Sequence, residues 1–188
     1  NPSPSAMGNT ALDTLASHIS GNYQEIGTGI VHSAQYPTRL FDIENVLLKL
    51  HEHAQITCDI ETFALQFNEA GIGTIAFAWD QHNGVAFRVD HNPGDPNKEV
   101  RYLLRQFFDE YQGTLIFHNA NFDMKVLVYA LYMSNMLDER GKQEGIEKLT
   151  RRFHDTKLIT YLATNSTTGN KLSLKDQAHA FAGNYAQA

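Results

Sequence analysis

Hydrophobic residues change their spacing along this chain, and these changes predict the order of its helices and strands. From residue 42 to 50 they recur every three to four positions, as on one face of a helix, and Asp42 is placed to cap that helix. The dipeptide Asn83-Gly84 is typical of a tight turn, so we expect the strands around it to form a hairpin. Short apolar or alternating runs predict three successive strands, at residues 55–60, 72–79 and 85–89.

The second half of the chain continues with helical patterns and one more strand. Apolar residues at helical spacing predict a helix from Val100 to Tyr111, and a short apolar strand follows at 114–117. A further helix is predicted from about Asn121, whereas residues 138–148 are charged and contain glycine, which indicates a solvent-exposed loop. The last two helices are predicted after two residues of capping type, Asp155 and Ser173.

This order of elements predicts an α/β fold. The hairpin supplies antiparallel pairing, and a crossover helix allows the fourth strand to lie parallel to the first. We therefore expect a mixed sheet, an antiparallel three-strand meander plus a parallel strand, with flanking helices. Residues 1–10 hold two Pro and two Ser, which predicts a flexible leader. We expect residues 1–40 to be an N-terminal extension and residues 41–188 to form the domain.

Composition excludes several kinds of protein. The length of 188 residues suits one domain, and the formal net charge of −6 argues against a protein that coats nucleic acid by charge alone. A single cysteine, Cys58, allows no intramolecular disulfide and no thiolate zinc site, so we expect a small buried strand residue. No apolar run approaches the roughly 18 residues of a membrane span. Residues 1–10 carry neither Lys nor Arg, unlike a secretory signal.

Two Asp-x-Glu pairs are candidates for metal chemistry. Residues two apart on a strand project to the same face, so Asp59 and Glu61 at the end of the first strand would hold two carboxylates together. Such carboxylates repel each other unless a proton or a cation lies between them, and hard oxygen ligands suit Mg²⁺ or Mn²⁺. On the predicted helix, Asp42 and Glu44 lie about 200° apart around the axis and cannot share an ion.

A third carboxylate is expected beside the strand pair. The segment from Leu115 to Asp123 runs from a buried strand into a helix, with Asn119 in the corner. Ligands collect where strand ends meet helix N-termini in α/β sheets. If the first and fourth strands are neighbours, Asp59, Glu61 and Asp123 converge there; alternatively, Asp123 only interacts with the helix dipole. The basic residues expected nearest to this place are Lys125, Arg151 and Arg152, and the sequence assigns none of them a role there.

These residues resemble the first and second motifs of the DnaQ-like (DEDD) 3′–5′ exonucleases. The first motif is similar to Asp59-Ile60-Glu61-Thr62 with Leu65, and the second to Asn119-x-x-Phe122-Asp123. The variant that looks closest is the proofreading exonuclease domain of family A DNA polymerases, including the phage enzymes. The likeness extends over about residues 40–188 and implies a ribonuclease H-like fold.

The resemblance also implies a mechanism with two divalent ions, Mg²⁺ or Mn²⁺. Asp59 would bridge the two ions. Glu61 would bind the first ion and orient the attacking water, and Asp123 would hold the second ion. The implied reaction releases 5′-mononucleotides from a single-stranded or frayed DNA 3′ end.

Four further residues would bind the nucleic acid. Thr62 and Leu65 would meet the terminal nucleotide, with Leu65 as an apolar wedge against the last base. Asn119 would hydrogen-bond the sugar-phosphate, and Phe122 would pack the corner. The implied partner is a polymerase domain C-terminal to this chain, and no membrane is expected as a partner. The implied location is the cytoplasm of a bacterium or of a phage-infected host cell.

The family's fourth carboxylate lies in a third motif, Tyr-x-x-x-Asp or His-x-x-x-x-Asp, of which the sequence shows no copy. His118 and Asp123 match the second form by letter, but Asp123 already belongs to the second motif. Asp155 is placed to cap a helix, so we expect the third motif beyond Ala188. Two other functions stay open: a catalytically silent nuclease-like binding module and a stand-alone DEDD ribonuclease.

Overall fold

The computed structural model describes residues 33–80, 82–164 and 172–182, and the predicted leader lies outside them. The chain divides into two units, residues 31–174 and residues 1–30 with 175–188. Helix α7 (Leu174–Ala182) belongs mainly to the second unit. The elements of the first unit are β1 (Ser33–Gln35), α2 (Leu40–Leu50), β2 (Gln55–Glu61), β3 (Thr74–Ala78), β4 (Asn83–Arg88), α3 (Val100–Glu110), β5 (Thr114–Phe117), α4 (Ala120–Tyr132), α5 (Glu139–Thr150), β6 (Phe153–Asp155) and α6 (Thr156–Thr164).

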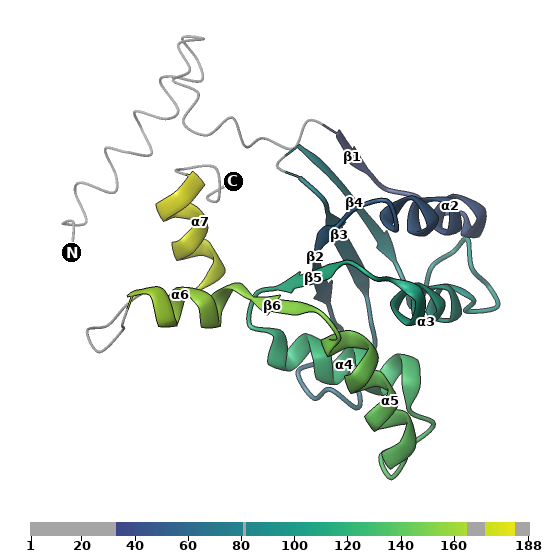
Figure 1. The fold of residues 1–188 in the computed structure, drawn as a ribbon. Helices are drawn as coiled ribbons and strands as arrows, with labels where there is room; N and C mark the ends of the chain where they lie inside the picture. The colour runs from purple at the N-terminus through teal and green to yellow at the C-terminus, as the bar shows by residue number, and fades with distance from the viewer. Residues whose placement is uncertain (1–32, 81, 165–171, 183–188) are drawn as a thin grey trace. The chain divides into compact units, whose positions relative to one another are not determined.

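A mixed sheet of six strands organises the described part of the first unit (Figure 1). The strand order is β1-β4-β3-β2-β5-β6. Strands β2, β3 and β4 pair antiparallel as the predicted meander, and β5 lies parallel to β2. The predicted α/β mixed sheet is therefore confirmed. The strands β1 and β6, which the hydrophobic pattern did not predict, add parallel pairs to β4 and β5.

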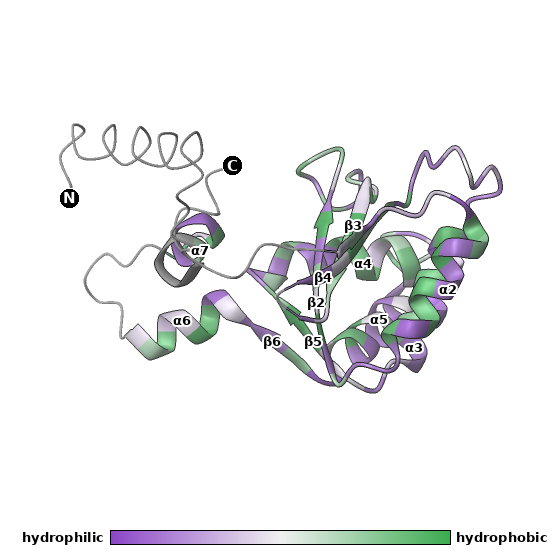
Figure 2. Cartoon of the chain, turned by 90° about the horizontal axis from the view of Figure 1, so that it is seen from above, coloured by the Kyte–Doolittle hydropathy of each residue, from purple (hydrophilic) through white to green (hydrophobic). Residues whose placement is uncertain are grey.

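The two faces of the sheet differ in chemistry. Exposed and buried residues alternate along β2, which places Asp59 and Glu61 on the exposed face. Helices α2, α3 and α4 pack on the other, apolar face (Figure 2). There the Phe77 ring of β3 contacts Phe107 and Phe108 of α3, with centroids 5.6 and 6.3 Å away. The buried residues of β2 are Ile56, Ile60 and, as predicted, Cys58.

Two boundaries differ from the predictions. α2 begins at Leu40, with Arg39 as its N-cap residue, so Asp42 lies inside the first turn and does not cap the helix. Its carboxylate instead accepts hydrogen bonds from the Arg39 guanidinium, and an acid at this position also favours the helix dipole. Asn83 is the first residue of β4 rather than part of a turn. The connection before it is organised by Asp80, whose carboxylate accepts hydrogen bonds from the Asn83 side chain.

Residues 139–148 belong to helix α5, whereas the sequence predicts a solvent-exposed loop over residues 138–148. Asp138 caps this helix by accepting a hydrogen bond from the backbone N–H of the third helical residue. The glycines are packing residues, because a Cβ added at Gly145 would lie 2.9 Å from the Tyr132 ring of α4. Glycine therefore allows α5 to approach α4 closely.

Helix α6 starts directly after the edge strand β6 (Figure 1). All of its residues are described, and none is buried. Across the ranges that the structure describes, no helix has both the length and the apolar character needed to span a bilayer.

Candidate active site

Asp59 and Glu61 lie at the C-terminal end of β2, on its exposed face. Strand β5 pairs with the first half of β2, where Thr57 is aligned with Ile116. Because the two strands are parallel, the chain that leaves β5 after Phe117 passes beside Asp59. The predicted neighbourhood of the first and fourth strands is confirmed.

The corner between β5 and α4 supplies the third carboxylate. Asp123 lies in the first turn of α4, and only 7 % of it is exposed. The chain turns at Asn119, whose backbone adopts a left-handed conformation with φ 63°. Asparagine occupies this region more readily than most residues. Both residues lie in the elements that the sequence predicted for them.

The electrostatics of Asp123 and Asp59 show that the carboxylates act on one another. The pKa of Asp123 is raised to about 7, first by loss of hydration and then by repulsion from three neighbouring carboxylates. Loss of hydration also raises the pKa of Asp59, with a second contribution from Glu61, while His118 opposes the shift. A proton or a divalent cation would relieve this repulsion. The carboxylates that act on Asp123 are Asp59, Glu61 and Asp155.

Asp155 caps two helices with one carboxylate. The predicted cap of α6 is confirmed, because Oδ1 accepts hydrogen bonds from the backbone N–H groups of Lys157 and Leu158, at 2.9 and 3.4 Å. The carboxylate also accepts from Asn119 and Ala120 at the start of α4, each at 2.9 Å. Loss of hydration acts to raise the pKa of Asp155, but these hydrogen bonds outweigh it and lower the pKa.

His118 is held beside Asp59 by a hydrogen bond to α6. Its Nδ1 lies 2.9 Å from the Thr156 hydroxyl, which itself donates to the Phe117 carbonyl oxygen at 3.2 Å. A hydroxyl has one hydrogen to donate, so Nδ1 is the donor to Thr156. The ring orientation is therefore fixed from the side of α6.

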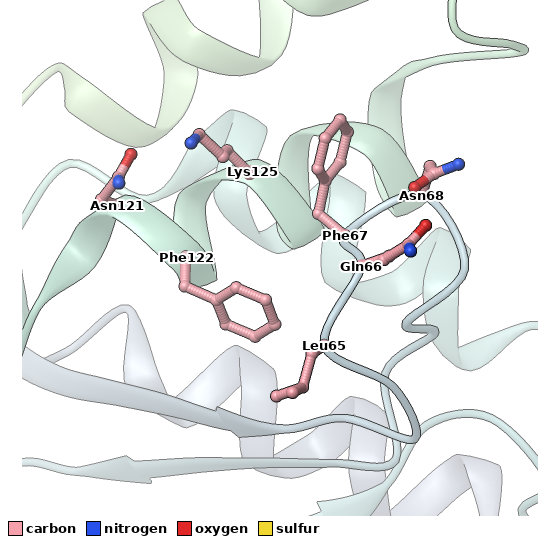
Figure 3. Close-up of a pocket in the computed structure, with 7 residues that line it drawn as sticks. All are labelled: Leu65, Gln66, Phe67, Asn68, Asn121, Phe122 and Lys125. Atoms are coloured by element: carbon pink, nitrogen blue, oxygen red, sulfur yellow. The ribbon is translucent and has the colours of Figure 1, made fainter.

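An open pocket of about 320 Å³ lies between the loop after β2 and the first turns of α4 (Figure 3). Leu65 and Phe122 form its apolar sides, and 92 % of Leu65 is exposed. Lys125 adds a positive charge. The pocket adjoins the carboxylates in sequence, because it begins four residues after Glu61. Its remaining lining residues are Gln66, Phe67, Asn68 and Asn121.

The other two predicted nucleic-acid contacts already have partners inside the protein. The Thr62 hydroxyl donates to the carbonyl oxygen of Ala64 at 3.0 Å. The Asn119 side-chain oxygen accepts a hydrogen bond from Nζ of Lys157 at 3.2 Å. The Thr62 hydroxyl oxygen and the Asn119 amide nitrogen keep the capacity to bind a substrate.

The basic residues near the site differ from the prediction. Lys157, which the sequence analysis missed, contacts the β5–α4 corner through Asn119. The sequence feature that could have indicated Lys157 is its position two residues after the capping Asp155. Arg151 and Arg152 do not belong to the site, because they donate to backbone carbonyls of the segment that precedes β5, at the opposite end of that strand.

The carboxylates of Asp59, Glu61 and Asp123 supply the oxygen ligands that Mg²⁺ prefers. Within the described ranges, Asp59, Glu61 and Asp123 form no ion pair with Lys or Arg. No three His, Cys, Asp or Glu side chains in that part of the chain are arranged to hold one ion between them. Mg²⁺ commonly binds through one or two carboxylates and completes its coordination with water and substrate phosphates. The residues present suit this open kind of site.

The fold and the site define a class of protein: an α/β domain whose mixed sheet carries a carboxylate cluster between a strand end and a helix N-terminus. The family model described as 3′–5′ exonuclease matches residues 34–187. The chain therefore belongs to this 3′–5′ exonuclease family. A search of curated proteins gives no match.

Solved structures share the fold at low sequence identity. One chain in the structure of the yeast NOT1 MIF4G domain co-crystallized with CAF1 has a TM-score of 0.60 at 11 % identity, and the match covers 83 % of this chain and 85 % of that one. The RNase domain of the yeast Pop2 protein has a TM-score of 0.55 at 11 % identity, covering 83 % and 82 %. Escherichia coli RNase D, described as an exoribonuclease involved in structured RNA processing, has a TM-score of 0.54 at 12 % identity. That match covers 80 % of this chain but 34 % of the RNase D chain.

Proposed function

We propose that this domain is a metal-dependent exonuclease that releases 5′-mononucleotides from DNA 3′ ends, as the proofreading part of a DNA polymerase. The observation that carries the proposal is the cluster of Asp59, Glu61 and Asp123, in which repulsion contributes to a pKa of about 7 for Asp123. A phosphodiester is anionic, so a site of carboxylates alone would repel it. The family membership and the likeness of the two motifs to proofreading domains support the same reaction.

The carboxylates have distinct tasks in the proposed mechanism. Asp59, Glu61 and Asp123 would hold divalent ions, Mg²⁺ or Mn²⁺, which when bound activate water and stabilise the charge that develops on the phosphate. Glu61 would also accept a hydrogen bond from the attacking water and so orient it. Asp123 must lose its proton to bind a cation, so cation affinity should rise as the pH increases through about 7.

The pocket beside the cluster offers local contacts to a nucleic-acid end. Leu65 and Phe122 would pack against the terminal base, since stacking and apolar contacts bind the bases of single strands without regard to their sequence. Lys125 and Lys157 supply positive charge for the phosphates. The side-chain nitrogen of Asn119 would donate to the sugar-phosphate. A net charge of −6 is compatible with binding of this local kind.

A ribonuclease is the second candidate. The observation that favours it is the fold shared with RNase D and with the RNase domain of Pop2, both named for action on RNA. The chemistry of the carboxylate cluster would be the same. The two candidates differ only in the sugar of the substrate.

Matched oligonucleotides test the choice between the two substrates. Single-stranded DNA and RNA of one sequence, labelled at the 5′ end, are incubated with the protein and Mg²⁺ or Mn²⁺. We expect stepwise shortening from the 3′ end, and hydrolysis of DNA at least about tenfold faster than RNA, a difference of about 1.4 kcal/mol in the barrier. EDTA should abolish the hydrolysis, and the Asp59→Asn substitution should reduce it on the order of 10³-fold or more.

Each other outcome assigns a different function. Faster hydrolysis of RNA supports the ribonuclease. Oligonucleotide binding without hydrolysis supports a catalytically silent binding module. Hydrolysis that persists in Asp59→Asn contradicts the proposed site. The proofreading role predicts a Tyr-x-x-x-Asp motif and polymerase-like sequence in the reading frame that follows residue 188.

A further inference from the structure

We propose that Asp155 is a positioning residue that sets the place of Asp123 relative to the carboxylates of β2, and thereby the affinity of the site for a divalent cation. This inference rests on the proposed metal-dependent function. Asp155 contacts neither the cation nor the substrate in that mechanism. It acts through the helix that carries Asp123.

The carboxylate of Asp155 joins three elements. Asp155 is the last residue of β6, and it is aligned with Phe117, the last residue of β5. Its oxygens accept backbone N–H groups at the starts of both α4 and α6, among them Ala120 and Lys157 at 2.9 Å each. The edge of the sheet and two helix N-termini are thus tied to one side chain.

Helix α4 depends on this contact because it has no side-chain cap of its own. Its N-cap residue, Asn119, has left-handed backbone geometry and makes no capping hydrogen bond. The Asn119 side-chain oxygen accepts from Lys157 instead. Asp155 therefore replaces the missing cap from another strand, and Asp123 lies only three residues after Ala120. A shift of the helix start would move Asp123 by a similar distance, away from Asp59 and Glu61.

Asp155 is poorly suited to bind the cation itself. Three of its four backbone hydrogen bonds fall on Oδ1, those from Asn119, Lys157 and Leu158, and the fourth, from Ala120, falls on Oδ2. A carboxylate oxygen offers two lone pairs, so Oδ1 is fully used. Its negative charge still acts on Asp123, so an experiment must separate position from charge.

Two substitutions make that separation. Asp155→Glu keeps the charge but moves the carboxylate by one methylene group relative to both helices. Asp155→Asn removes the charge and the acceptor of the Ala120 N–H, but keeps an oxygen where Oδ1 accepts three hydrogen bonds. We expect Asp155→Glu to raise the Kd for Mn²⁺ about tenfold or more, and more than Asp155→Asn does, as for residues that orient metal ligands. The free Mn²⁺ is measured by electron paramagnetic resonance without substrate, so the result does not depend on turnover.

Asp138→Glu is the matched control, because Asp138 caps α5 by accepting the backbone N–H of Gly141, outside the site. Its carboxylate also accepts the backbone N–H of Ser134, in the connection before α5. Urea denaturation identifies conditions in which every variant is folded. There, Asp138→Glu should bind Mn²⁺ like the parent protein. If Asp155→Glu does not fold, Asp155→Thr replaces it, since one hydroxyl cannot cap both helices, and the same loss is expected.

Two results would overturn the inference alone: Mn²⁺ binding by Asp155→Glu, or by its Thr replacement, equal to that of the parent, or a larger loss in Asp155→Asn than in Asp155→Glu. The second result would mean that the charge, with the one hydrogen bond that Asn cannot accept, matters more than the place of the carboxylate. A parent protein that binds no Mn²⁺ would overturn the proposed metal site together with this inference. The two failures are therefore distinguishable.

Discussion

The tripeptide Asp-Ile-Glu occurs twice in this chain, followed each time by a leucine four residues after the glutamate. The first copy, Asp42 to Glu44, lies on helix α2, and the second, Asp59 to Glu61, lies on strand β2. On the helix the two acids point about 200° apart, whereas on the strand they share a face. The same three letters thus create a carboxylate pair in only one of the two places.

The surroundings of the two copies differ as well. The Asp42 carboxylate has a cation, the Arg39 guanidinium, at 2.7 Å. Asp59 has acids as neighbours, Glu61 and Asp123, with His118 as the group that opposes the rise of its pKa. A short motif therefore acquires chemical meaning from the period of its secondary structure and from the element that the fold brings beside it.

The sharpest test of this comparison replaces the first acid of each copy. Asp59→Asn should reduce 3′–5′ hydrolysis on the order of 10³-fold or more, about 4 kcal/mol of transition-state stabilisation, because a metal-holding carboxylate is lost. Asp42→Asn should leave hydrolysis within about twofold, since it removes only an exposed ion pair on α2, which adds little to stability. Rates are measured on a labelled oligonucleotide at saturating Mg²⁺. Equal losses in both variants would contradict the assignment of the site to β2.

The second acids give a smaller contrast. Glu61→Gln should reduce the rate on the order of 10²-fold, because the amide can still accept a hydrogen bond from water but holds a cation weakly. A higher Mg²⁺ or Mn²⁺ concentration should restore part of this loss. Glu44→Gln should behave as the parent protein does. A Glu61→Gln variant with the parent's metal dependence would remove Glu61 from the set of metal ligands.

The proximity of Asp59, Glu61 and Asp123 could be predicted from the sequence, because apolar residues mark the strands and the helix that carry or adjoin them. Strand β5 and the start of α4 were recognised from apolar spacing, and the crossover geometry placed β5 beside β2. Asp59, Glu61 and Asp123 follow from these two facts. The pairing of parallel strands, rather than any longer motif, brings them together.

The elements and contacts around these residues could not be predicted from local sequence patterns. Strands β1 and β6 have three residues each and find their partners far away in the sequence, so they leave no local pattern. The hydrogen bond between Asp155 and Asn119 joins residues 36 positions apart. Helix α5 was missed because close packing on α4 requires the glycines that usually indicate a loop. Contacts between distant segments decide all of these features.

The pH dependence of stability gives a third contrast, between the buried carboxylate of Asp123 and the more exposed carboxylate of Asp138. The pKa of Asp123, about 7 in the folded state, lies above its unfolded value, so the folded state binds more protons and this group lowers stability as the pH rises from about 4 to 7. We compare the free energy of unfolding of Asp123→Asn with that of the parent protein at each pH. This difference should shift in favour of Asp123→Asn by about 1–3 kcal/mol between pH 5 and pH 8. Urea unfolding with EDTA measures the difference.

Asp138→Asn is the control for this experiment. Hydrogen bonds from the backbone of Gly141 and Ser134 lower the pKa of Asp138, so its contribution is present above about pH 4 and is lost only as the pH falls further. The effect of Asp138→Asn should thus be the same at pH 5 and pH 8. If Asp123→Asn shows no gain between these pH values, the carboxylates do not repel one another in the way that the fold indicates.

The two leucines that follow the tripeptides give the smallest contrast. Leu65 is 92 % exposed beside the pocket with Phe122, and Leu48 is 60 % exposed on α2. Leu65→Ala should raise KM for single-stranded DNA about three- to tenfold, with little change in kcat or stability, because it removes an apolar contact to the last base of about 1 kcal/mol. Leu48→Ala should change neither constant, although it removes the same atoms from a comparably exposed position. A rise in KM for both variants, or a lower kcat with an unchanged KM for Leu65→Ala, would show that Leu65 does not contact the terminal nucleotide. The functional difference between the two segments would then be limited to their acidic residues.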